Sequence, residues 1–331
     1  MSLSIALQTA TSGLQAAQAS LRAVSDNIAN VNTPGYVRKV ADQAQRVVNG
    51  AGQGVDVIGV RRITDQYLQL ASMSAGSDSS KFDVYSNFLD NAQALFGDPS
   101  GKDFFFNLPD DISAAFASSA NDPASSLLRG QALNTISNML SESDRITTQV
   151  GALRTTVDTQ VGNDVIKVND LLAQIDKLNV DISRARLSGG DATGSENIQG
   201  QLLNELSGLM NVRVSPRDNG GVTVRSAEGV ELAGEGAAKL SYNRSDTTPG
   251  YITVLTPGAN SGPQTITVNS GEIRGLLDLR DQKLPGIADQ MGEFVARLAQ
   301  QLNAAHNAST ADPPPTTLTG RDTGLDLPTA V

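Results

Sequence analysis

An uninterrupted heptad pattern over the first 36 residues is the feature that most constrains how this chain can fold. Apolar or small residues recur there at steps of four and three, which places them along one side of an α-helix. The large members of this seam are Leu3, Leu7, Leu14, Leu21, Val24, Ile28 and Val31. A single helix of this kind is only marginally stable in water, so the seam must pack against another part of the chain or against a neighbouring molecule. The spacing alone would also fit an ordinary helix of a bundle.

The helix ends in a run of polar residues and a predicted turn. Pro34 suits the first central position of a type II turn and Gly35 the second, where φ must be positive. The run closely resembles the N-terminal signature that rod, hook and hook-associated proteins of the bacterial flagellum share. The matching positions of this motif are Asn27, Ile28, Ala29, Asn30, Asn32, Thr33, Pro34, Gly35 and Tyr36. The motif indicates this group of axial proteins without distinguishing its members.

Composition argues against several classes of function. The 331 residues carry 25 basic and 35 acidic side chains, a net charge of −10, so no basic surface is available for nucleic acid. Cysteine is absent, which excludes disulfides and thiolate chemistry. The sequence has no apolar run of about eighteen residues, and its N-terminus lacks a basic region followed by an apolar one. We therefore predict no nucleic-acid partner, no membrane insertion and no cleavable signal peptide.

The pattern of apolar residues predicts a mainly helical chain with one short β-hairpin. Residues 50–54 are rich in glycine and lie between two extended segments, 46–48 and 55–60, so we predict that they form the hairpin turn. Helical spacing predicts further helices at 63–95, 104–116, 124–186 and 199–209, with a loop at 189–194. The longest carries a stutter near Val161, so one kinked helix and two consecutive helices are both compatible with the pattern.

From residue 211 the period changes from helical to two, which predicts a small antiparallel β unit. Helical spacing returns at 273–305, where Pro285 forces a kink or begins a new first turn. We predict an α+β, mainly α fold: an elongated antiparallel helical body with an N-terminal heptad helix and the inserted β unit. The expected divisions are 1–36 for the heptad helix, 37–210 completed by 270–310 for the helical body with its hairpin, 211–269 for the β unit, and 311–331 for a Pro- and Thr-rich linker.

Further segments of the chain resemble the hook-associated protein 1 family, whose members form the junction between flagellar hook and filament. These segments are 54–63, 121–124, 179–184, 203–207, 271–281 and 302–307. The resemblance implies an extracellular structural subunit that joins hook to filament after type III export. It implies as partners a homo-oligomeric ring, the hook subunit, hook-associated protein 3 and an export chaperone. The alternatives are another axial subunit, of hook or rod, and a surface adhesin that acts through its β unit.

The family pattern also contains a part that this sequence lacks. Family members are longer and end in a second heptad helix that packs against the N-terminal one, whereas this sequence stops at Val331. We therefore expect a piece of a longer protein, with the chaperone contact in the missing part. The N-terminal helix is expected to stay mobile in the monomer and to become ordered between neighbouring subunits.

No grouping of residues suggests catalysis, and we predict no catalytic, cofactor-binding or metal-binding residues. The single histidine, His306, ends the returning helix and has no second histidine with which to bind a metal. Asp110 and Asp111 follow Pro109 and are expected in the first turn of a helix, where the helix dipole favours them. Carboxylate pairs of the glycosidase type are separated in sequence and leave no local motif. An enzyme is the least favoured interpretation.

Overall fold

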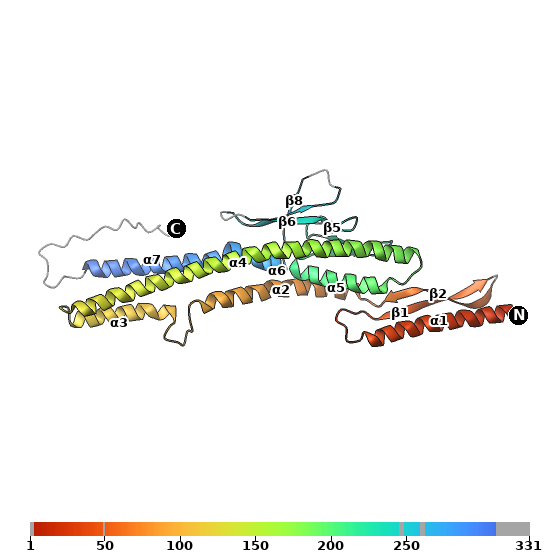
Figure 1. Cartoon of the computed structure of the whole chain (residues 1–331), viewed down its shortest axis with the longest axis horizontal. Helices are drawn as coiled ribbons and strands as arrows, with labels where there is room; N and C mark the ends of the chain where they lie inside the picture. Colours follow the sequence, from red (N-terminus) through yellow and green to blue (C-terminus); the bar gives the residue numbers. More distant parts are fainter. Residues whose placement is uncertain (1–2, 49, 245–247, 259–261, 309–331) are drawn as a thin grey trace. The chain divides into compact units, whose positions relative to one another are not determined.

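The computed structural model is mainly helical with small antiparallel sheets, as the sequence predicts (Figure 1). The helices are α1 (Leu3–Ala29), α2 (Gln66–Ala94), α3 (Leu108–Asn121), α4 (Ser126–Leu187), α5 (Thr193–Leu209), α6 (Glu272–Asp278) and α7 (Leu284–Ala308), with a 3₁₀ turn at Phe105–Asn107 and a π-helical turn at Leu279–Lys283. The strands are β1 (Lys39–Val48), β2 (Ala51–Arg62), β3 (Arg213–Pro216), β4 (Val222–Arg225), β5 (Glu231–Ala233), β6 (Lys239–Asn243), β7 (Tyr251–Leu255) and β8 (Gln264–Ile266). The structure describes residues 3–48, 50–244, 248–258 and 262–308, so the predicted linker 311–331 lies outside the described residues.

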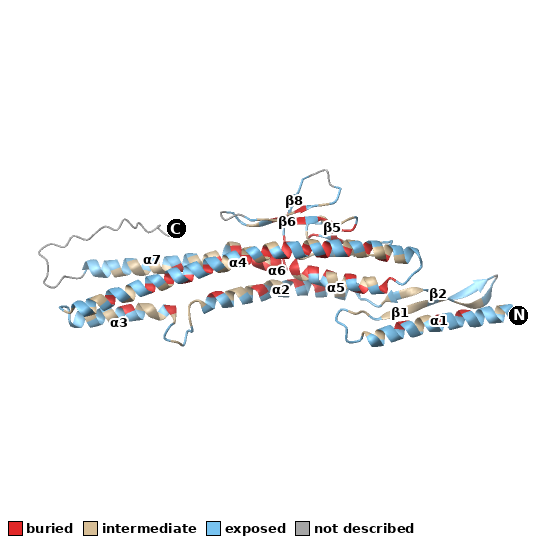
Figure 2. Cartoon of the chain, viewed as in Figure 1, coloured by how far each residue is buried: buried red, intermediate tan, exposed pale blue. Residues whose placement is uncertain are grey.

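The chain divides into two compact units. The first contains Met1–Ser86 and Val157–Asp278, and the second contains Asn87–Thr156 and the described part of Leu279–Val331. Helices α2 and α4 each continue from one unit into the other. Each unit has its own buried apolar side chains (Figure 2).

The core of the first unit follows one side of α4. Buried residues recur on this helix at Val157, Val161, Val165, Val168, Leu172, Ile175 and Ile182. Steps of three, four and finally seven residues keep them in one stripe, and the stutter at Val161 does not interrupt it. α4 is a single helix of 62 residues, so the alternative of two consecutive helices is wrong. Gly151 and Gly162 lie within it and do not divide it.

The β unit consists of two three-stranded antiparallel sheets, ordered β3-β4-β5 and β6-β7-β8. The buried apolar side chains of these strands include Val224, Leu232, Leu240, Ile252, Val254 and Ile266. Asparagine side chains hold both sheets to α4. Asn179 Nδ2 donates to the carbonyl of Val222 at 2.8 Å, and its Oδ1 accepts from the amide of Val222 at 2.8 Å. Asn169 makes the same two bonds with Leu240, at 2.9 and 2.7 Å.

The hairpin of β1 and β2 is longer than predicted, and its turn is shorter. Val48 pairs with Ala51, so the second strand begins at Ala51, within the predicted turn. Gly52 and Gly54 belong to β2 and not to the turn, which corrects the prediction for 50–54. The glycine at 54 instead leaves room for α1, because a side chain there would clash with Ser12.

The later helices differ from the prediction at two places, the start of α5 and the position of Pro285. α5 begins at Thr193, well before the predicted start at Gln199, so the predicted loop is shorter. Asp191, just before the N-cap residue Ala192, satisfies a free N–H of the first turn: its Oδ1 accepts hydrogen bonds from the amide and the hydroxyl of Thr193, at 2.8 and 2.6 Å. Pro285 is the second residue of α7, but α6, the π-helical turn at Leu279–Lys283 and α7 follow one another without a gap, so the proline does not begin a separate first turn. The π-helical turn lies directly before the proline, whose ring removes an N–H from the helix.

An aromatic cluster forms part of the core of the second unit. Phe105 is almost fully buried, and its ring centroid lies 5.3 Å from that of Phe106, 6.0 Å from that of Phe294 and 6.2 Å from that of Phe96. These edge-to-face contacts suit the quadrupoles of the rings. The two aspartates that follow Pro109 lie in the first turn of α3, as predicted.

Asp164 is a buried carboxylate of α4 whose charge opposes folding. Among the described residues, its Oδ2 has no hydrogen-bond partner. Burial, together with the charge of Glu272, raises the pKa of Asp164 from 3.8 to about 7. The folded protein therefore holds a proton that the unfolded chain has released. The free energy of unfolding consequently falls as the pH rises through the interval between these two values.

We predict that Asp164→Asn, which removes the charge and keeps the shape, raises the melting temperature near pH 8 and changes it little near pH 4. Thermal unfolding followed by circular dichroism at the two pH values measures this effect. Asp170→Asn, at an exposed position of the same helix, is the control and should change the melting temperature little at either pH. A gain for Asp164→Asn that is equal at both pH values would contradict the assignment.

Candidate functional site

The predicted seam of α1 is exposed along its whole length. Its large residues keep between 51% of their surface exposed, at Val24, and 87%, at Leu3. The others are Leu7, Leu14, Leu21, Ile28 and Val31. Most of α1 is accordingly pale blue in Figure 2. Val31 lies in the turn after α1, so the helix ends before the last predicted residue of the seam. Within the described parts of the chain, the seam is an apolar stripe that faces solvent, and its role in assembly stays a prediction.

α1 contacts the hairpin through a different and nearly opposite face. The buried residues of this face, Ser12, Ala16 and Ala23, are all small. Ser12 Oγ accepts a hydrogen bond from the amide of Val55 at 3.1 Å, which ties the helix to β2. The sequence does contain this signal, since small residues recur at helical spacing. It was missed because the large residues of the seam dominate the pattern.

Asn27, in the motif that ends α1, bonds to the start of β1. Its Nδ2 donates to the carbonyl of Lys39 at 2.8 Å, and its Oδ1 accepts from the amide of Lys39 at 2.9 Å. The same Oδ1 also accepts from the hydroxyl of Tyr36 at 3.0 Å. The structure therefore brings the first and last residues of the motif together, which the sequence alone did not indicate.

The turn between these residues has the predicted features. The amide of Tyr36 donates to the carbonyl of Thr33 at 3.1 Å, and Gly35 has a φ of 75°. Gln201 of α5 donates from Nε2 to the carbonyl of Pro34 at 2.6 Å, and its Cγ would lie 2.7 Å from a Cβ at Gly35. Glycine suits this position because its φ is positive, and a Cβ here would require the exposed side chain of Gln201 to move. The remaining motif residues are Ile28, Ala29 and Asn32, which are exposed, and Asn30, which is half-buried.

Lys39 adds ion pairs at the same corner of the first unit. Its Nζ lies 2.6 Å from a carboxylate oxygen of Asp26 and 3.4 Å from one of Asp191. Burial disfavours the charge of Lys39, but the two carboxylates outweigh it and raise the pKa of Lys39. Both carboxylates are largely exposed, so we assign these pairs only a small share of the stability.

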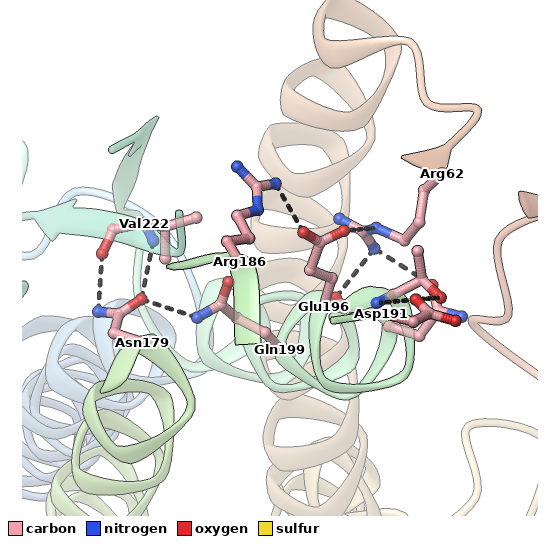
Figure 3. Close-up of polar contacts among 9 residues, drawn as sticks. Arg62, Asn179, Arg186, Asp191, Glu196, Gln199 and Val222 are labelled. Atoms are coloured by element: carbon pink, nitrogen blue, oxygen red, sulfur yellow. Dashed lines mark hydrogen bonds and ion pairs between the residues drawn. The ribbon is translucent and has the colours of Figure 1, made fainter. Parts of the chain in front are cut away.

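A second polar cluster fixes the last residue of β2 to α5 (Figure 3). Arg62 Nε donates to Glu196 Oε2 at 3.1 Å, and Arg62 Nη1 donates to the backbone carbonyl of Glu196 at 2.9 Å. Arg186 Nη2 donates to Glu196 Oε1 at 2.6 Å. Burial lowers the pKa of Arg62, although Glu196 opposes this shift. The largely buried carboxylate of Glu196 is thus compensated by two guanidinium groups. Sequence reasoning did not find this cluster.

Two glutamates of the β unit form ordinary polar contacts, and the single histidine is exposed. Glu228 accepts a hydrogen bond from the amide of Thr267 at 2.9 Å, and Glu231 lies 3.3 Å from Arg225. His306 is exposed in the last turn of α7. Among the residues that the structure describes, no group of three or more His, Asp or Glu could hold a metal ion. The described helices include none that is long and apolar enough to cross a membrane.

We predict that Gly54→Ala weakens the docking of α1 on the hairpin by about 1–3 kcal/mol. The φ of Gly54 is 113°, and a Cβ there would clash with Ser12 Oγ. Amides of α1 should consequently exchange with solvent faster, as measured by hydrogen exchange and mass spectrometry. Gly50→Ala is the control, because its φ of 78° is also positive while nothing lies within 4 Å of a Cβ there. Equal exchange in the two variants would show that close approach at Gly54 does not limit docking.

Comparison with known proteins defines first the class and then the family. Residues 7–36, which contain most of the seam and the motif, match the family described as flagella basal body rod protein. Residues 73–326 match the family described as flagellar hook-associated protein FlgK helical domain. The class is thus that of flagellar structural proteins. Because the second match covers most of the chain, the chain belongs to the FlgK family of flagellar hook-associated proteins.

Individual relatives agree with this assignment. The chain is 31% identical over 326 residues to flagellar hook-associated protein 1 of Escherichia coli K12, covering 92% of this chain and 58% of that protein. It is 29% identical over 323 residues to the protein of the same name from Salmonella typhimurium, covering 92% and 57%. The chain therefore spans somewhat more than half the length of these relatives. The structure of the flagellar hook junction protein FlgK from Burkholderia pseudomallei has the same fold, with a TM-score of 0.62 and 21% identity over 73% of this chain and 44% of that one.

Proposed function

We propose that the chain is part of a structural subunit of the junction between flagellar hook and filament. The observation that carries this proposal is the match of residues 73–326 to the FlgK helical domain. The exposed seam supports it, because a subunit that assembles needs apolar surface that its own fold leaves free. The proposed role is structural rather than enzymatic.

The seam of α1 is the proposed assembly surface. A second heptad helix, from a part of the protein beyond this chain, covers the seam when subunits form a ring. Successive subunits in a ring meet through different surfaces, so the contact is heterologous. In this proposal the body, 37–210 with 270–310, supplies lateral contacts, and the β unit, 211–269, faces outward.

The proposed partners lie along the flagellar axis. The hook subunit contacts the ring on one side, and hook-associated protein 3 contacts it on the other. The subunit leaves the cell by type III export without a cleavable signal peptide, after an export chaperone has bound it outside the present chain. It then works outside the cell, at the distal end of the hook.

α1 is proposed to be held only weakly in the monomer. Its buried face contains one serine and two alanines, so its docking removes little apolar area from water. In the ring, each large side chain of the seam would contribute about 2 kcal/mol on burial. Most of the apolar energy of α1 is thus gained on assembly, which couples the ordering of the helix to ring formation.

Deletion of the full-length gene should give cells with complete hooks and no filaments, with flagellin released into the medium. The physical reason is that flagellin then has no surface at the hook end on which to polymerise. Electron microscopy of the cells and a flagellin assay of the medium measure the two effects, and the restored gene is the control. Missing hooks would indicate a rod or hook subunit instead, and normal flagella would favour an adhesin.

Leu14→Ala with Leu21→Ala in the full-length protein should prevent filament formation while leaving the melting temperature of the monomer nearly unchanged. Both side chains are exposed in the monomer, so truncation costs little there, whereas burial in the ring would lose about 2 kcal/mol for each. Gln15→Ala with Gln18→Ala, exposed on the same helix outside the seam, is the matched control. Normal filaments in cells that carry the double leucine variant would contradict the role of the seam.

A further inference from the structure

We infer that Asn27 is the positioning residue of α1: its side-chain amide holds the helix on the first residue of β1 and so turns the seam away from the hairpin. We call the bonds of Asn27 with Lys39 and Tyr36 the Asn27 latch. The inference rests on the proposed function only in that the face presented in this way is the assembly seam. It also gives the motif that ends α1 a function within the chain.

The geometry of the latch is specific to asparagine. Its amide donates to the carbonyl of Lys39 at 2.8 Å and accepts from the amide of the same residue at 2.9 Å, with Tyr36 as a third partner at 3.0 Å. One side chain thus pairs with both backbone groups of a strand residue. An aspartate could not donate, and a serine would be too short to reach both groups.

The latch matters more for α1 than the same pairing does for α4. Asn169 and Asn179 of α4 bond to Leu240 and Val222 in the same way, but a continuous stripe of buried large residues flanks them. The docked face of α1 buries only three small side chains. Hydrogen bonds that would be one contribution among many at α4 are therefore a large share of what holds α1.

Three polar contacts between α1 and the hairpin fix the rotation of α1 about its own axis. They are the Asn27 latch, the bond from Gln43 Nε2 to Ser20 Oγ at 2.8 Å, and the bond from the amide of Val55 to Ser12 Oγ, which lies about four helical turns from the latch. With all three in place, the seam residue Leu14 lies on the exposed side. If α1 rotated by one residue, about 100°, these bonds would break and large seam residues would move toward the hairpin. Loss of the latch is therefore expected to weaken the hydrogen bond at Ser12 as well.

The test is hydrogen exchange by NMR on the 331-residue chain with Asn27→Ala. The amide of Lys39 reports the latch directly, and the amide of Val55 reports the distant contact with Ser12. We expect exchange at Lys39 to become at least about tenfold faster, from the loss of two hydrogen bonds, and exchange at Val55 to rise with it. The melting temperature should stay nearly unchanged. Faster exchange at Lys39 alone would show that Asn27 makes only a local contact. Unchanged exchange at both amides would show that the latch does not hold α1. Either result overturns the inference.

Three further variants control the experiment. Asn30→Ala removes an amide just after α1 that donates to the carbonyl of Asp26 and accepts from the hydroxyl of Thr33 but does not bond to β1, and it should leave both reporting amides unchanged. Lys39→Met removes the ion pairs and keeps the backbone pairing, so it should also leave them protected. Tyr36→Phe removes one of the three bonds and should give a smaller increase at both amides. If Asn27→Ala fails to fold, Tyr36→Phe decides the question, and unchanged exchange in it overturns the inference.

The proposed role of the Asn27 latch and the proposed role of the seam in assembly are tested independently. Exchange is measured on the monomer, so a failed latch leaves the seam as an assembly surface. Normal filaments with Leu14→Ala and Leu21→Ala would reject the seam and leave the latch in place as a structural contact.

Discussion

The pairing of one asparagine side chain with both backbone groups of one strand residue recurs at three places where a helix of the first unit meets a strand. The pairs are Asn27 with Lys39, Asn169 with Leu240, and Asn179 with Val222. An amide donates and accepts at once, so it satisfies an N–H and a C=O that the covering helix would otherwise remove from water. The pairing also fixes the position of the helix along the strand, which apolar contacts alone do not do.

The two helices that use this pairing bury different amounts of apolar surface. α4 adds a continuous stripe of large buried side chains, so its sheets are held by packing and by polar bonds together. α1 presents small residues to the hairpin and keeps its large ones in solvent, and its position depends on polar bonds. Hydrogen bonds of this kind contribute about 1 kcal/mol each, much less than a buried stripe. A helix held in this way can be placed accurately and still be released at small cost.

Local patterns predicted much of the fold. The spacing of apolar residues indicated α1, α4 and the β unit. The contacts that build the candidate site could not be predicted in this way. Asn27 and Lys39 are 12 residues apart, and Arg62 and Glu196 are 134 apart, so neither pair leaves a periodic signal. Their chemistry is also ambiguous, because a polar residue on a helix is usually solvated.

These long-range contacts meet at the base of the hairpin. Lys39 of β1 is the register partner of Arg62 of β2. The Asn27 latch therefore holds β1, and the Arg62–Glu196 cluster holds β2, at the same residue pair of the hairpin. A slip of one residue would turn Arg62 to the other face of the hairpin and away from Glu196. The same slip would be opposed by Asn27, which accepts and donates only at Lys39 of this strand. The register is thus fixed at the base, and the two irregularities, between Asp42 and Gln43 and between Gln45 and Val47, lie beyond it. The position of α1 on the first unit consequently depends on one strand pair that is held from both sides.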